Sequence, residues 1–253
     1  MIHYHGLPIT PNSSALVALD GGHAFVPFPR PEQLGLVIEA CQSFAVDNGA
    51  FSAWKSGDPV TDWSRYYEWI AGIHRIPGFD FAVIPDVVDG TEQDNDKLLA
   101  EWAWKETEIG APVWHLHESL KRLDKLVSNY PRICLGSSGQ YASPGDVGWW
   151  GRINEAMRVI CNKDGLPGCK LHGLRMLDPS IFTKIPFSSA DSTNLARNIG
   201  MDLKWKGTYN PISKDSRAWV LRQRIEREQS ATYWQKQPTQ ECWLENSLLP
   251  NTS

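Results

Sequence analysis

The sequence predicts an α/β fold in the form of a compact TIM-type (β/α)₈ barrel. Short apolar segments alternate with amphipathic segments of helical period along most of the chain, as expected for βα units around a parallel sheet. The 253 residues match the roughly 250 that such a barrel needs. No G-x-G-x-x-G follows the first strand, which disfavours a dinucleotide-binding fold. Periodicity alone leaves an open doubly wound sheet as the alternative.

Seven apolar segments have the length and composition of strands. They are residues 2–6, 43–47, 79–86, 111–117, 132–137, 170–176 and 185–191. The eighth strand of a barrel is less distinct, and we place it near residues 205–209.

Helices are predicted between these strands, over residues 60–74, 91–109 and 145–162, where apolar residues recur at helical spacing or capping signals occur. Thr91 and Asp94 have the spacing of a capping box at the start of the second helix. Gly110 is placed as the residue that ends it.

We expect a single domain over residues 1–253, with a barrel core and active-site rim in 1–200 and a basic segment with a polar tail in 201–253. Residues 202–227 contain seven Lys and Arg against three acids, in a chain of net charge −4. A local basic segment on an acidic body is compatible with nucleic-acid contact. The alternative is a solvated helix face.

Cysteine usage and hydropathy bear on the cellular location and on metals. The five cysteines are an odd number and widely scattered, which indicates reduced thiols. Cys161, Cys169 and His172 lack the paired spacing of a structural zinc site, so we expect no metal. No apolar run reaches the roughly 18 residues of a membrane span, and no signal peptide is evident. We therefore expect a cytoplasmic protein with no membrane partner.

Polar or small residues lie at or near the carboxyl ends of the predicted strands, and in a barrel these ends form one rim. These residues are Asp47, Asp86, His115, His117, Gly136, Ser137, His172 and Asp191. Each acid could instead be an ordinary turn or N-cap residue. Their recurrence at successive strand ends favours one site that contains several carboxylates.

Paired carboxylates at such a rim suit attack on the anomeric carbon of a sugar. One acid stays ionised as the nucleophile, and the other, with a raised pKa, transfers protons. A third carboxylate can accept hydrogen bonds from the N1–H and amino group of a guanine-like base.

Five short motifs occur in an order that resembles the tRNA-guanine transglycosylases. They are DNGAF (47–51), IPDVVD (84–89), LGSSG (135–139), LHGL (171–174) and SADSTNLARNIG (189–200). The chain is most similar to the short phage-type relatives that put 7-deazaguanine bases into DNA. The resemblance implies a (β/α)₈ barrel and a pentosyltransferase that exchanges guanine in a polynucleotide for a 7-deazaguanine, without a cofactor.

The resemblance also implies roles for individual residues. Asp191 falls on the nucleophile and Asp47 on the acid/base group. Asp86 would read the base edge, Gly136 with Ser137 would contact the base, and Phe51 with His172 would stack on it. His115 or His117 stands where the family has a base-recognising Gln. The polynucleotide would be held by Arg197, to which we add from the basic segment Lys204, Lys206, Lys214, Arg217, Arg222 and Arg224.

The family's C-x-C-x₂-C zinc motif is absent after residue 200, which implies that the zinc subdomain is missing. Since that subdomain helps to hold tRNA, we expect DNA as the partner, with tRNA as the alternative and a free 7-deazaguanine base as co-substrate. The sequence leaves a homodimer open.

Three other functions remain open from the sequence. The first is an N-glycosidase or glycoside hydrolase that uses water, and the second is a non-catalytic nucleic-acid-binding subunit of the same fold. The third is a metal-dependent hydrolase built on His115 and His117, which have H-x-H spacing.

Overall fold

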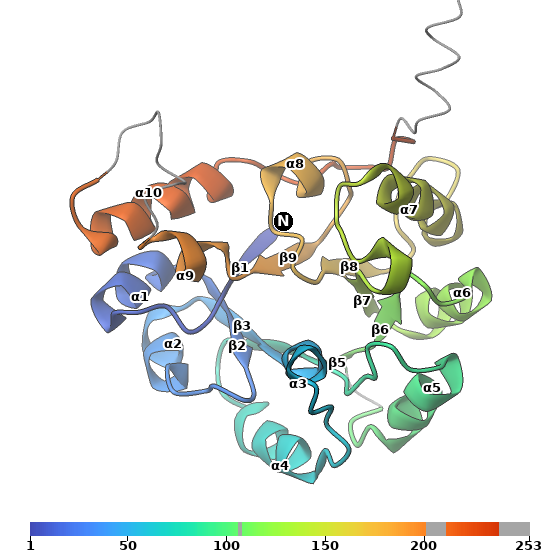
Figure 1. Cartoon of the computed structure of the whole chain (residues 1–253), viewed down its shortest axis with the longest axis horizontal. Coiled ribbons are helices and arrows are strands. Elements are labelled where there is room, and N and C mark those ends of the chain that lie inside the picture. Colours follow the sequence, from blue (N-terminus) through green and yellow to red (C-terminus); the bar gives the residue numbers. More distant parts are fainter. Residues whose placement is uncertain (106–107, 201–210, 238–253) are drawn as a thin grey trace, which may run out of the picture.

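The computed structural model describes residues 1–105, 108–200 and 211–237. It confirms the predicted TIM-type barrel, because parallel strands form a nearly closed ring surrounded by helices (Figure 1). The strand order is β5-β4-β3-β2-β1-β9-β8-β7-β6. The strands are β1 (Ile2–Gly6), β2 (His23–Pro27), β3 (Ser43–Asp47), β4 (Phe79–Val83), β5 (Gly110–Ala111), β6 (Val113–His115), β7 (Arg132–Gly136), β8 (Lys170–Gly173) and β9 (Ser189–Ser192).

Strands β5 and β6 occupy one position of the barrel and are separated by Pro112. Strand β5 pairs with β4, whereas β6 pairs with β7. Proline has no N–H to donate, but its carbonyl still accepts from the backbone N–H of Cys134 at 2.8 Å. The nine described strands therefore fill eight positions.

The strand that completes the barrel is β2, which lies in register between β1 and β3. The predicted strand near 205–209 lies outside the described residues. Segment 23–27 is not predicted as a strand from the sequence because turn-forming residues stand on both sides of it. Gly21 and Gly22 precede it, and prolines stand at 27, 29 and 31.

The described helices lie around the barrel, apart from α3 near its mouth (Figure 1). They are α1 (Asn12–Leu19), α2 (Leu34–Ala40), α3 (Ala50–Ser56), α4 (Ser64–Ile73), α5 (Glu92–Glu101), α6 (Leu120–Asn129), α7 (Val147–Ile160), α8 (Pro179–Phe182), α9 (Asn194–Asn198) and α10 (Lys214–Glu226). Helices α4, α5 and α7 confirm the three predicted ones, and the capping box of α5 is present. Helix α5 ends at Glu101, however, and Gly110 begins β5.

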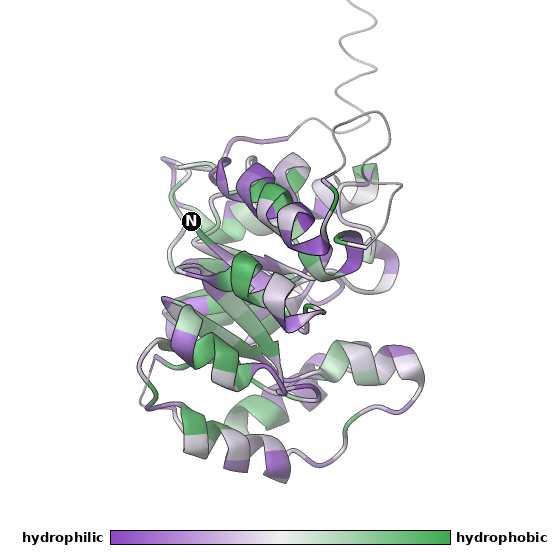
Figure 2. Cartoon of the chain, turned by 90° about the vertical axis from the view of Figure 1, so that its left-hand side faces the viewer, coloured by the Kyte–Doolittle hydropathy of each residue, from purple (hydrophilic) through white to green (hydrophobic). Residues whose placement is uncertain are grey.

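Two groups of buried side chains hold the fold together. The larger group lies between the strands and the helices, and the smaller one fills the barrel around Tyr4 and Phe81. Figure 2 shows mainly hydrophobic strands in the centre and helices of mixed hydropathy outside them. Inside the barrel, the Tyr4 hydroxyl donates to Asp80 at 2.6 Å, and Arg132 forms an ion pair with the same carboxylate. Tyr4 and Arg132 thus share one carboxylate inside the barrel, away from the rim.

Helix α10 belongs to the helical layer of the barrel, although it lies beyond the expected core boundary at residue 200. Its buried residues Ala218, Leu221 and Ile225 pack into the larger core. Asp215 accepts from Ser14 at the start of α1, and Arg222 donates to the carbonyl of Asp20 after its end. Helix α10 therefore runs from the rim toward the opposite end of the barrel.

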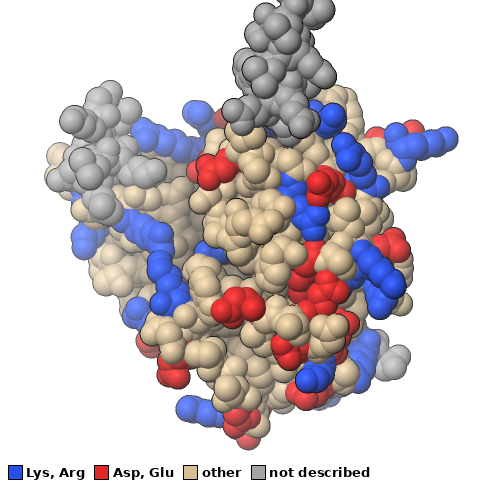
Figure 3. Space-filling view, turned by 45° about the vertical axis from the view of Figure 1, so that its right-hand side comes forward, with Lys and Arg blue, Asp and Glu red and all other residues tan. Residues whose placement is uncertain are grey.

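Within the described ranges, no helix is long and apolar enough to cross a membrane. On the face drawn in Figure 3, Asp and Glu side chains gather in one group, with Lys and Arg side chains beside it and elsewhere on the face. The charge is thus unevenly distributed over this face.

Candidate active site

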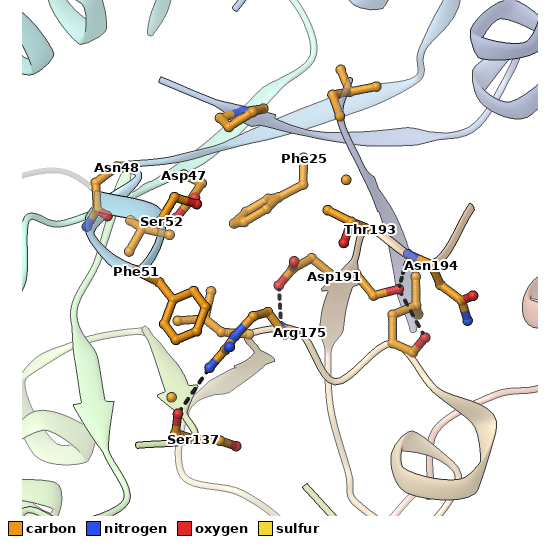
Figure 4. A pocket seen from close by; sticks show the side chains of 18 of the residues that line it. Phe25, Asp47, Asn48, Phe51, Ser52, Ser137, Arg175, Asp191, Thr193 and Asn194 are labelled. Carbon is orange, nitrogen blue, oxygen red and sulfur yellow. Dashed lines mark hydrogen bonds between the residues drawn. The ribbon is translucent and has the colours of Figure 1, made fainter. Parts of the chain in front are cut away.

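A cavity of about 820 Å³ opens at the carboxyl ends of the strands. As predicted, Asp47, Asp86 and Asp191 all line it, from the end of β3, the loop after β4 and the end of β9. Figure 4 shows Asp47 and Asp191 on either side of the ring of Phe25. The barrel therefore brings together three carboxylates that are far apart in the sequence.

Asp191 is buried and is held through one of its two carboxylate oxygens. Oδ1 accepts from the backbone N–H of Arg175 at 2.9 Å and from Nε2 of His172 at 3.3 Å. Oδ2 forms no hydrogen bond to any residue that the structure describes. One oxygen thus orients the group, and the other remains available to a ligand.

Asp47 is the group whose protonation the site changes most clearly. Burial raises the pKa of Asp47 to about 7, and the negative charges of Asp191 and Asp86 act in the same direction. The Gly49 N–H and the Arg175 charge oppose this rise only in part. Asp47 can therefore both donate and accept a proton near neutral pH.

The loop after Asp47 explains the DNGAF motif. Gly49 has a φ of 83°, and a Cβ there would lie 2.4 Å from Cγ of Pro29, so only glycine fits. The Asn48 side chain accepts from the N–H of Ala50 at 2.8 Å and donates to Asp86 at 2.7 Å. Through Asn48, the motif thus links the start of α3 to the carboxylate of Asp86. The role of Asn48 was not foreseen from the sequence.

Asp86 is fixed by two neighbours, one on each oxygen. Oδ1 accepts from Asn48, and Oδ2 accepts from Nε2 of His115 at 2.9 Å. A carboxylate oxygen has two lone pairs, so Asp86 can still accept from a ligand. Nδ1 of His115 is buried and has no partner among the described atoms.

His115 is itself held by a buried ion pair. Its backbone N–H donates to Glu118 at 2.9 Å, and Glu118 accepts from Arg122 at 2.7 Å and from Asn95 at 2.9 Å. Such a network fixes the strand end and with it the imidazole that contacts Asp86.

The prediction that His172 stacks on a base is wrong. His172 is fully buried and does not line the cavity. Its ring stacks under Phe25 at a centroid distance of 5.3 Å. Burial lowers the pKa of His172, which favours a neutral ring that donates to Asp191 and accepts from Ser189. The aromatic floor of the cavity is Phe25, which was missed together with strand β2.

Phe51 lines the cavity, but its ring face is not free. The guanidinium carbon of Arg175 lies 3.5 Å from the ring centroid, a cation–π contact (Figure 4). The same guanidinium donates to the carbonyl of Ser137 at 3.0 Å. Arg175, which directly follows the LHGL motif, is thus a site residue that the motif did not reveal.

The remaining predicted base-binding residues divide into two groups. Gly136 and Ser137 line the cavity, and a Cβ on Gly136 would lie 3.2 Å from Nδ1 of His115. His117 does not line it and instead bonds to Ser138 at 2.8 Å. Of the two histidines considered, only His115 faces the cavity.

Of the predicted phosphate-binding residues, Arg197 lies at the cavity and is exposed. Lys204 and Lys206 lie outside the described residues. Lys214, Arg217, Arg222 and Arg224 are on α10 and do not line the cavity. Arg222 donates to Glu226 and to the carbonyl of Asp20, toward the opposite end of the barrel, so it lies away from the cavity at which a polynucleotide was predicted. Arg30 and Lys55 line the cavity instead, and no motif had indicated them.

Comparison of the chain with known protein families, curated proteins and solved structures gives no match. In the described part of the chain, no three His, Cys, Asp or Glu side chains are grouped so that they could hold a metal ion.

The raised pKa of Asp47 predicts a pH-dependent stability. Between about pH 4 and pH 7 the unfolded chain ionises this group while the folded protein keeps it protonated, so the free energy of unfolding falls as pH rises. Above pH 7 the loss is complete, at up to about 4 kcal/mol. We expect Asp47→Asn to stabilise the protein at pH 8 and much less at pH 4. Denaturant unfolding at both pH values measures this, and equal effects at both would contradict it.

Proposed function

We propose that the protein is a base-exchange glycosyltransferase that replaces guanine in a polynucleotide with a 7-deazaguanine derivative. The observation that carries the proposal is the pair of carboxylates across one cavity. Asp191 has an oxygen free to attack, and Asp47 has a pKa of about 7. These are the two roles that exchange at an anomeric carbon requires.

In the first step, Oδ2 of Asp191 attacks C1′ of the target nucleotide. The C1′–N9 bond breaks, its electron pair goes to guanine, and protonated Asp47 supplies the proton. The products are free guanine and a glycosyl ester of Asp191. The N–H of Arg175 and Nε2 of His172 hold the attacking carboxylate in place through Oδ1.

In the second step, Asp47 is ionised and takes the N9 proton of the incoming base. N9 then attacks C1′, the ester bond breaks, and Asp191 is released as a carboxylate. Two inversions give overall retention at C1′. One glycosidic bond replaces another, so the reaction needs neither ATP nor an oxidant.

The cavity also suits the recognition of a purine. Asp86, fixed by Asn48 and His115, can accept from the N1–H and amino group of a guanine-like base. Phe25 supplies an aromatic floor, and stacking contributes roughly 1–3 kcal/mol per base. This offsets part of the few kcal/mol needed to flip a base out of a duplex.

A basic rim supports a polynucleotide as the substrate, with DNA proposed and tRNA as the alternative. Arg30, Lys55 and Arg197 all line the cavity and are exposed. The cations lie around the opening and the carboxylates lie inside it. This arrangement suits a substrate whose base enters the cavity while its phosphates stay at the rim.

The rim predicts that binding depends on salt. We expect Lys55→Gln and Arg197→Gln each to weaken binding to DNA and to lower the slope of log K against log salt by about 1. Lys170→Gln, at the start of β8 and away from the rim, serves as the control. Fluorescence anisotropy at several salt concentrations measures the slopes. If both rim variants have the same slope as the wild type, the rim does not contact the phosphates of DNA.

Labelled guanine tests the function as a whole. The protein is incubated with labelled guanine and either DNA or tRNA, and the label in the polynucleotide is counted. Incorporation into one of them supports the exchange and identifies the substrate. Release of free base without incorporation would indicate a hydrolase, and binding with neither result would indicate a non-catalytic subunit.

A further inference from the structure

Arg175 has an unusual backbone conformation within the candidate active site. Its φ is 59°, in the left-handed region, and it is the only non-glycine residue of the described chain with a positive φ. The conformation directs its N–H to Asp191 at 2.9 Å. Such a backbone conformation persists only where the surrounding structure fixes it, and it is commonest at active sites and ligand clamps.

The Arg175 side chain lines the cavity and makes two contacts that fix its position. The guanidinium lies over Phe51, 3.5 Å from the ring centroid, and Nη2 donates to the carbonyl of Ser137 at 3.0 Å. Phe51 is in α3 and Ser137 directly follows β7, whereas Arg175 follows β8. Three separate elements therefore fix the position of this one cation.

Most of the hydrogen-bonding capacity of Arg175 remains available. A guanidinium has five N–H donors, and the cation–π contact with Phe51 uses none of them. Among the described residues, only the bond from Nη2 to Ser137 is formed. Arg175 lines the cavity and is accessible to solvent. A positioned cation with free donors suits a ligand edge that carries two acceptors.

We propose that Arg175 determines base specificity by donating to O6 and to an acceptor beside it at position 7. This inference rests on the proposed function. Asp86 would take the donor edge of the base, and Arg175 the adjacent acceptor edge. Guanine offers O6 and N7, the pair that arginine commonly reads. An incoming 7-deazaguanine would then carry a neutral or anionic acceptor at C7, because a cationic amine would be repelled.

Guanine and unsubstituted 7-deazaguanine form the matched pair of probes, since they differ only in the acceptor at position 7. We expect the wild type to favour guanine by about tenfold or more in kcat/KM for incorporation, mostly through KM. In Arg175→Gly this preference falls to near unity. Glycine favours the left-handed backbone and keeps the N–H to Asp191, so the variant should fold. Arg175→Lys keeps the charge but loses the planar fork, and it also loses most of the preference.

Calorimetry with the two free bases separates this inference from the proposed function. If the wild type incorporates guanine but the preference is the same in Arg175→Gly, the specificity role is overturned and base exchange stands. If the wild type incorporates neither base, base exchange fails. In that case a calorimetric preference for guanine that Arg175→Gly lacks would support Arg175 as a base-reading residue, and equal or undetectable binding of the two bases would overturn it. Lys170→Gln, at the other end of β8, serves as the control and should keep the wild-type preference.

Discussion

The Asp191→Asn variant is expected to lose guanine exchange by roughly three orders of magnitude or more while it still binds polynucleotide. The asparagine oxygen can keep the bonds from Arg175 and His172, so the local structure should survive. What is lost is the carboxylate oxygen that attacks C1′. Incorporation of labelled guanine measures the loss, and anisotropy with DNA measures the retained binding.

Asp178→Asn is the matched control for this variant. Asp178 also lies at the cavity, but its carboxylate caps α8 by accepting from the N–H of Ser180 at 2.9 Å. Asparagine caps a helix nearly as well as aspartate, so exchange should be close to wild type. Undiminished exchange by Asp191→Asn would remove Asp191 from the mechanism.

The Asp47→Asn variant is expected to slow exchange by about 10²–10⁴, the usual contribution of a general acid or base. With the pKa of Asp47 at about 7, release of guanine from the polynucleotide in the wild type should slow as pH rises above 7. The reason is that the protonated carboxyl donates to the leaving base. Single-turnover release measured from pH 5 to pH 9 gives this profile, and the variant should lack the inflection.

An inflection near pH 7 that persists in Asp47→Asn would assign the titration to another group. The stability of the variant supplies an independent control, because Asp47→Asn should unfold at higher denaturant concentration than the wild type at pH 8. A slow but more stable variant indicates lost chemistry, whereas a slow and unstable one would indicate damaged folding.

Most of the barrel could be predicted from the sequence because its strands are apolar segments with clear gaps between them. Helix α5 was evident from its capping box, and α4 and α7 from their helical spacing. Strand β2 was missed because local turn signals at Gly21, Gly22 and the following prolines outweighed five strand residues. Its place is set by pairing with β1 and β3, which is long-range information.

The carboxylates of the site were predictable for a topological reason. In a parallel barrel every strand ends at the same rim, so Asp47, Asp86 and Asp191 could be expected around one opening once the strands were known. The direction in which each side chain points was harder to predict from the sequence. His172 lies on β8 but faces the barrel interior, whereas His117 lies beyond β6 and bonds to Ser138.

The residues that were missed act through contacts between elements distant in sequence. Phe25 reaches the cavity from β2, and Arg175 reaches Phe51 on α3. The basic segment, in contrast, led to the prediction of phosphate-binding residues that do not lie at the cavity. A count of charges in 202–227 could not show that Arg222 binds Glu226 at the far end of α10. Charge density along the chain is thus a weaker guide than position around the mouth.

Peptide mass spectrometry of the protein, denatured with acid after incubation with DNA or tRNA but without free base, tests the central claim most directly. We expect a peptide containing Asp191 that carries, after nuclease digestion, the base-free sugar phosphate of the target nucleotide, and its disappearance when guanine is added before denaturation. An adduct on the Asp47 or Asp86 peptide, or release of guanine with no adduct on any peptide, would contradict the assignment of Asp191 as the nucleophile.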